Sequence, residues 1–213
     1  MKARSHIAIA ALSLLAAGCA SRGEIDPTGG ITAVRTACPS VGVPAATGDI
    51  TLFTSPTGRT AADIDVAALI TDVRSTCNDT VDPIYTAITF DVLARRTRTD
   101  GARDVTFPFY STVVQGGTVV VAKRVAQVTV HFEPGQERAR ASATAGAYVE
   151  RAAATLPQDV RDQITKQRKA GRADAAVDPL TNPAVRTAVL KASFEALVGF
   201  QLTDDQLKYN ATR

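Results

Sequence analysis

The sequence of 213 residues contains no tryptophan, and aromatic residues make up only 5% of it. A carbohydrate-binding platform is built on large aromatic rings, so this composition argues against one. Of the two histidines, only His131 lies beyond the first 18 residues. A histidine-rich zinc site is therefore excluded from the remainder of the chain. We expect neither a metal nor a cofactor.

Strong charge of one sign and long apolar runs are also missing. The chain has 24 Lys and Arg against 21 Asp and Glu, a formal net charge of +3, which falls to +1 without Lys2 and Arg4. Nucleic-acid binding needs a concentrated basic surface, which this balance does not predict. After residue 18 no stretch approaches the roughly 18 apolar residues that a transmembrane helix needs.

The N-terminal segment carries the clearest signal. Lys2 and Arg4 precede an uncharged apolar run over residues 7–17. As a helix this run is about 16 Å long, roughly half the hydrocarbon core of a bilayer. A basic start followed by a short apolar run and small residues predicts a signal peptide over residues 1–18, in preference to a buried helix.

The end of that segment, Ala-Ala-Gly-Cys at residues 16–19, resembles the lipobox of bacterial lipoproteins, although Ala16 stands where that family favours leucine. The resemblance implies cleavage after Gly18 and acylation of Cys19. Two or three acyl chains anchor a protein stably, whereas one chain does so only marginally. Because Ala20 rather than aspartate follows the cysteine, the family's sorting pattern implies the outer membrane, with the protein facing the periplasm. The resemblance covers about twenty residues and implies nothing about the domain that follows.

Two cysteines remain once Cys19 is lipidated, namely Cys38 and Cys77. The periplasm is oxidising, so we expect them to form a disulfide, with two buried free thiols or half of a metal site as the alternatives. In the chain-entropy treatment, closing a loop of this length stabilises the folded state by about 4 kcal/mol.

The chain is organised as a tether and one domain. Residues 19–48 are small, polar and rich in glycine and proline, which predicts a lipidated tether whose far end Cys38 fixes to the fold. Residues 49–213 are long enough for a single domain with a sizeable core.

Alternating apolar residues predict strands in the first part of this domain. The segment 64–76 also fits a helix, and Pro108 suggests an edge strand or a bulge. Gly116 and Gly117, between two β-branched runs, predict a tight hairpin rather than a phosphate loop. A second turn is expected at 133–136. The predicted strands cover residues 50–53, 64–76, 84–95, 105–114, 119–132 and 138–144.

Helical spacing dominates the C-terminal third. An apolar stripe from Val149 to Ile164 predicts an amphipathic helix that restarts at Pro157. Asn182 caps a second predicted helix, which runs through Phe194 and stops at Gly199. Thr203 and Gln206 form a capping box for a last short helix. The predicted fold is therefore α+β, an antiparallel β-sandwich or half-barrel of five to seven strands with two or three C-terminal helices.

Few residues suggest chemistry. His131 lies in an apolar strand with no motif that supplies a nucleophile, so we expect a structural histidine rather than a general base. Asp204 and Asp205 fit the first turn of a helix, where negative charge is favoured. Asp63 and Asp65 are expected to face solvent on a strand or turn. These interpretations leave no catalytic residue.

A basic cluster at the end of the first C-terminal helix consists of Lys166, Arg168, Lys169 and Arg172. Cations there complement the helix dipole. The functional alternative is contact with an anionic surface, such as lipid headgroups or the acidic cell-wall polymer, which tethering would strengthen.

These features favour a lipid-anchored envelope protein that is not an enzyme and that binds or assembles with another envelope protein. The alternative is a carrier of a small apolar ligand or lipid held between sheet and helix. A hydrolase that uses His131 is a distant third hypothesis.

Overall fold

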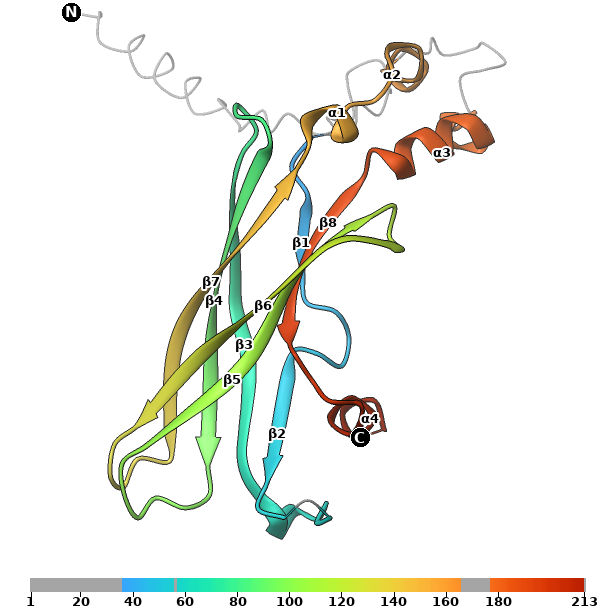
Figure 1. Ribbon diagram of the computed structural model, residues 1–213. Coiled ribbons are helices and arrows are strands. Elements are labelled where there is room, and N and C mark those ends of the chain that lie inside the picture. Colours follow the sequence, from blue (N-terminus) through green and yellow to red (C-terminus); the bar gives the residue numbers. More distant parts are fainter. Residues whose placement is uncertain (1–35, 56, 166–176, 213) are drawn as a thin grey trace, which may run out of the picture.

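The computed structural model describes residues 36–55, 57–165 and 177–212, which fold into two four-stranded sheets packed face to face (Figure 1). The strand orders are β1-β8-β5-β6 and β2-β3-β4-β7. The predicted α+β sandwich is confirmed, and its described part has eight strands rather than the predicted five to seven. They are β1 (Ser40–Gly42), β2 (Asp49–Phe53), β3 (Ile64–Asn78), β4 (Ile84–Arg96), β5 (Arg103–Gln115), β6 (Val119–Phe132), β7 (Arg138–Val149) and β8 (Phe194–Phe200).

Alternation accounts for the strands of the second sheet. In β4, Ile88, Phe90 and Val92 are buried between the sheets, while the residues of opposite parity are directed outward. β3 is a strand over its whole length, so the helix alternative for 64–76 is wrong. Its inward residues include Val66 and Ile70, which lie in the same core.

The predicted hairpin joins β5 to β6. Gly116 and Gly117 both have positive φ, 62° and 76°, and the amide of Thr118 donates to the carbonyl of Gln115 at 3.3 Å. β5 is not an edge strand, since β8 and β6 flank it. Pro108 is tolerated because β8 pairs with β5 only from Phe109 onward, so no strand residue faces its missing N–H.

The turn at 133–136 also forms, with the amide of Gln136 donating to the carbonyl of Glu133 at 3.0 Å. It leads from β6 in one sheet to β7 in the other, so these two strands are not a hairpin. Glu133–Gln136 therefore closes one end of the sandwich.

The C-terminal third differs from its prediction at two places. Val149 ends β7 instead of beginning a helix, and the segment from Phe194 to Gly199 lies in β8. β8 pairs with both β1 and β5, and these hydrogen bonds outweigh a helical spacing that fits either structure. Gly199 gives space to Thr47, whose Oγ1 would lie 2.4 Å from an added Cβ.

Four helices occur among the described residues, and the two caps predicted from the sequence, at α3 and α4, are present. The Asn182 side chain accepts from the amide of Ala184 at 3.0 Å, and Thr203 and Gln206 bond reciprocally. α4 packs on β2, where Phe53 and Tyr209 meet edge to face at 5.1 Å. The helices are α1 (Arg151–Ala154), α2 (Gln158–Thr165), α3 (Pro183–Lys191) and α4 (Asp204–Thr212).

The Cys38–Cys77 disulfide is present, with a Cα–Cα distance of 6.1 Å. It joins the start of the described chain to the end of β3. Residues 40–42, which the sequence assigned to the tether, form β1 and pair in parallel with β8. No helix among the described residues is long and apolar enough to cross a membrane.

Candidate protein-binding surface

The two halves of β6 have opposite environments. Near its C-terminal end, Val128, Val130 and Phe132 are buried in the core. Residues 119–127, called the β6 arm below, are all exposed. Figure 1 shows the reason: the β5–β6 hairpin diverges from β7 toward its tip, so the second sheet no longer covers it.

The β6 arm is rich in valine. Val119, Val120, Val121 and Val125 are between 50% and 61% exposed. Single exposed apolar residues are common on protein surfaces, but a run of them on one strand is not. The arm is therefore a candidate contact surface.

The backbone of the arm has a free edge, since β6 pairs only with β5 within the described part of the chain. Pro108 of β5 lies opposite Gln127, and the Pro108 carbonyl accepts from Gln201 on the side away from β6. In an antiparallel pair, directly opposed residues point their backbone groups either at each other or both away. Gln127 therefore directs its N–H and C=O outward, and so do Val125 and Lys123 at intervals of two.

The tip of the hairpin is attached to the body of the protein. The Gln115 side chain donates to the carbonyl of Lys191 at 2.7 Å, and the amide of Gly116 donates to the carbonyl of Ser193 at 2.9 Å. Both acceptors lie at the corner between α3 and β8. These bonds hold the free edge in an extended conformation, which lowers the entropy cost of binding.

The arm is cationic. Lys123 and Arg124 lie at its centre, and no acidic residue occurs between positions 105 and 132. The Lys123 ammonium is 5.0 Å from the centre of the Tyr110 ring, and the Arg124 guanidinium is 5.8 Å from that of Tyr148. Charges at this position oppose pairing between identical edges, a common protection of exposed strands, and they favour an acidic partner.

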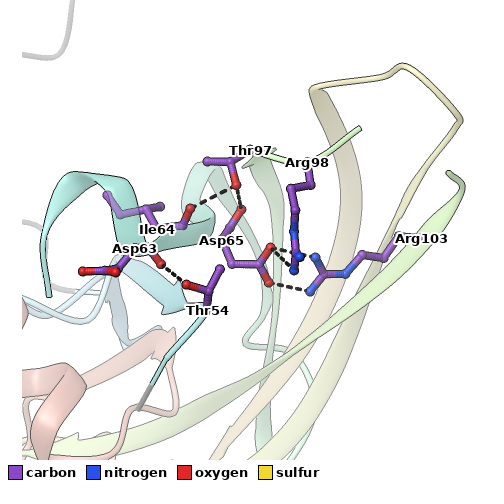
Figure 2. A network of polar contacts seen from close by, with 7 residues as sticks. All are labelled: Thr54, Asp63, Ile64, Asp65, Thr97, Arg98 and Arg103. Carbon is purple, nitrogen blue, oxygen red and sulfur yellow. Dashed lines mark hydrogen bonds and ion pairs between the residues drawn. The ribbon is translucent and has the colours of Figure 1, made fainter. Parts of the chain in front are cut away.

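The opposite end of the hairpin contains an ion pair between the buried Asp65 and the partly exposed Arg103. Two bonds of 2.8 and 2.7 Å join the Arg103 guanidinium to the Asp65 carboxylate, and Arg98 lies 3.9 Å from it (Figure 2). Thr97 donates to the carbonyls of Ile64 and Asp65 at 3.0 and 3.3 Å. The bond from Arg103 is the main reason that the pKa of Asp65 lies below its usual value, and burial opposes this shift.

The prediction that Asp65 faces solvent is wrong, since it is 7% exposed. Leu52 pairs with Val66 and Phe53 with Ile64, so Asp65 is an extra residue in β3. Such a bulge rotates the side chain out of the strand's regular alternation. The carboxylate therefore points toward the opposite sheet, where it meets Arg103 of β5.

Arg96, which the sequence analysis overlooked, is the largest fully buried side chain, at 1% exposure. Its guanidinium donates to the carbonyls of Gln136, Gly101 and Glu133 at 2.8, 2.7 and 2.7 Å and lies 5.0 Å from the centre of the Phe132 ring. Strand parity was the available signal, because Arg96 continues the inward positions of β4.

His131 lies beside two carboxylates on the outer face of the hairpin. Its Nδ1 is 2.6 Å from Asp104, and its Nε2 is 3.4 Å from Glu133. The contact with Asp104, assisted by Glu133, raises the pKa of His131. This arrangement favours the imidazolium, which has no lone pair with which to accept a proton as a general base.

The other candidate residues do not assemble into a site. Asp204 and Asp205 occupy the first turn of α4, and Asp63 accepts hydrogen bonds from Thr60 at the start of a short 3-10 helix. No cluster of three potential metal ligands occurs within residues 36–55, 57–165 and 177–212. The proposed lipidation site Cys19 lies outside the described residues, as does the basic cluster of Lys166, Arg168, Lys169 and Arg172.

No protein-family model matches the chain, and no curated protein matches it.

Proposed function

We propose that this protein is a lipid-anchored, non-enzymatic binding module of the bacterial cell envelope, and that it binds an extended segment of another envelope protein along the free edge of β6. The β6 arm is the observation that carries this proposal. A partner strand would take up the outward N–H and C=O groups of Lys123, Val125 and Gln127.

The partner segment should be apolar and acidic. Valines on both faces of the arm offer contacts to alternate side chains of an added strand. Lys123 and Arg124 would pair with carboxylates, which distinguishes such a segment from a second copy of the cationic arm. Because the tip is bonded to the α3–β8 corner, the edge needs little reorganisation.

The anchor would add proximity to this recognition. Acyl chains on Cys19 would hold the protein on the outer membrane, facing the periplasm, and residues 20–37 would link the lipid to the domain. Tethering raises the effective concentration of a weak binding edge near other envelope proteins. The resemblance of residues 16–19 to a lipobox and the export-compatible disulfide support this placement.

Site-specific photo-crosslinking in cells would test the proposal. A photoreactive residue at position 125 should capture one defined envelope protein, whereas the same residue at the exposed Asp100, at the opposite end of the β5–β6 hairpin, should not. A capture that is equally strong at both positions, or absent at 125, would contradict binding along β6.

A proline pair separates strand addition from general surface contact. Val125→Pro removes an outward N–H while keeping the hydrogen bonds to β5, so we expect loss of capture with the fold intact. Val125→Thr, which keeps the N–H and the β-branched shape, should retain most of it. If Val125→Pro binds as well as the wild type, the partner does not pair with the free edge.

A further inference from the structure

A hollow on the outer face of the second sheet forms a site separate from the β6 arm. Two cross-strand rows of side chains share this face. One row runs Asp49, Leu69, Leu93 and Arg140 across β2, β3, β4 and β7, and the next runs Thr51, Ala67, Arg95 and Arg138. We call the space that they line the arginine-rimmed hollow; its volume is about 690 Å³, within the range of ligand sites.

The floor of the hollow is apolar and in contact with solvent. Leu69 and Leu93 are about half exposed, although they lie side by side at the centre of a sheet. Ala67 beside them is small, which leaves the sheet surface open at that point. An alkyl group seated here would remove both leucines from water, which is favourable.

The charges of the hollow are asymmetric. Arg95 and Arg138 are directly opposed on β4 and β7, an arrangement of like charges that is unfavourable by itself. Arg95 pairs with Glu137, and Arg140 lies 3.4 Å from Asp91. Within the described residues, no carboxylate pairs with Arg138. Among the described residues, the β7 side of the hollow therefore has an uncompensated cation.

From these features we infer that the arginine-rimmed hollow binds a single-chain anionic amphiphile, with its carboxylate or phosphate head at Arg138 and its alkyl chain over Leu69 and Leu93. The orientation follows from the positions of these side chains: Arg138 lies on β7 at one side of the hollow, and Leu93 and Leu69 extend from there across β4 and β3. A fatty acid and a lysophospholipid both present this chemistry.

The test is a calorimetric titration of the full-length protein carrying Cys19→Ala, which removes the thiol needed for lipidation, with probes below their micelle concentrations. Dodecanoate and dodecyl phosphate should bind saturably with one site each. Dodecyl maltoside and dodecyltrimethylammonium, which carry the same chain with a neutral or cationic head, should bind at least tenfold more weakly. A preference for one of the two anions distinguishes a carboxylate from a phosphate ligand.

Two pairs of variants locate the site. Arg138→Gln should weaken both anionic probes about tenfold, whereas Arg186→Gln on α3 should leave them unchanged. Leu69→Ser should weaken all alkyl probes, and Val125→Ser, which changes an equally exposed residue of the β6 arm, should not.

Equal binding of the neutral and anionic probes would overturn the inference, as would an unchanged affinity in Arg138→Gln. The inference would also be overturned if Val125→Ser and Leu69→Ser weakened binding of the alkyl probes to the same extent. That result would indicate general adsorption to exposed apolar residues. If inorganic phosphate displaced dodecyl phosphate at equal concentration, the hollow would bind the anionic head alone, and the alkyl chain would contribute nothing.

Discussion

The two ends of the β5–β6 hairpin invert the usual distribution of residues. At its base, the charged groups of Asp65 and Arg96 are buried in the sandwich and hydrogen-bonded, Asp65 to the partly exposed Arg103. Toward its tip, valines lie in solvent along an unpaired edge. Buried charge requires partners within the fold, and the base contains them. The exposed valines near the tip neither fill the core nor pair with another strand within the described residues. Contact with a partner protein explains them better.

Substitution of Arg96, at the base of the hairpin, should lower the free energy of unfolding most. Arg96→Ala leaves the carbonyls of Gly101, Glu133 and Gln136 without their donors and empties space beside Phe132. We expect a loss of about 4 kcal/mol in the free energy of unfolding, measured by urea denaturation.

The neighbouring Arg95→Ala is its control, because Arg95 is exposed and its ion pair within the described part of the chain is with Glu137 alone. It should cost less than about 1 kcal/mol. Equal losses of unfolding free energy in the two variants would mean that the burial of Arg96 and its bonds to the three carbonyls do not stabilise the fold.

Asp65→Asn should have the next largest effect, about 2 kcal/mol at neutral pH, because it removes a buried carboxylate that binds Arg103. This is less than the loss expected for a fully buried ion pair, since water reaches Arg103. Since folding lowers the pKa of Asp65, its contribution is present above the unfolded value of about 3.9 and is lost as pH falls through the folded pKa. Unfolding curves measured at pH 7 and pH 3 should therefore show a smaller difference in the free energy of unfolding between wild type and variant at pH 3. A difference between wild type and variant that does not shrink at all from pH 7 to pH 3 would point to packing rather than charge.

The contribution of His131 to stability should be smaller than that of Asp65, and it should decrease rather than increase as pH rises. Because Asp104 raises its pKa in the folded state, the stabilisation is complete below the unfolded value of about 6.5 and is lost as pH rises through the folded pKa. An NMR titration of the ring should have its midpoint above the ordinary value. In Asp104→Asn the midpoint should fall, and an unchanged midpoint would show that the contact is not formed in solution.

Charge reversal in the arm should change stability least. Replacing Lys123 and Arg124 by glutamate alters exposed side chains, so the free energy of unfolding should change by no more than about 0.5 kcal/mol. Capture of the partner from position 125 should nevertheless be lost. If capture persists, the cationic centre of the arm does not select its partner.

Local patterns were sufficient to predict much of the fold. The parity of β4, the glycine pair of the β5–β6 hairpin and the caps at Asn182 and Thr203 each depend on residues close in sequence. β8 could not be predicted in this way, since the spacing of its apolar residues fits a helix until β1 and β5 provide strand partners.

The candidate sites were harder to predict, because each depends on contacts between distant segments. A bulge directs Asp65 inward, and no sequence feature of β3 reveals it. The run of valines from Val119 is typical of a buried strand, and it is exposed only because β7 diverges from the hairpin. The arginine-rimmed hollow arises from the register of four strands, which unites residues from Asp49 to Arg140.

The disulfide between Cys38 and Cys77 also determines how a mechanical load enters the domain. A pull on the chain before Cys38 passes through the sulfur atoms to the end of β3, which pairs along its length with β4. The three-residue strand β1 lies beyond this junction and carries little of the force. In the reduced protein the same pull would act directly on β1 and peel it from β8. If the protein is attached to a membrane through Cys19, as we propose, the disulfide would thus protect β1 from the load on the tether.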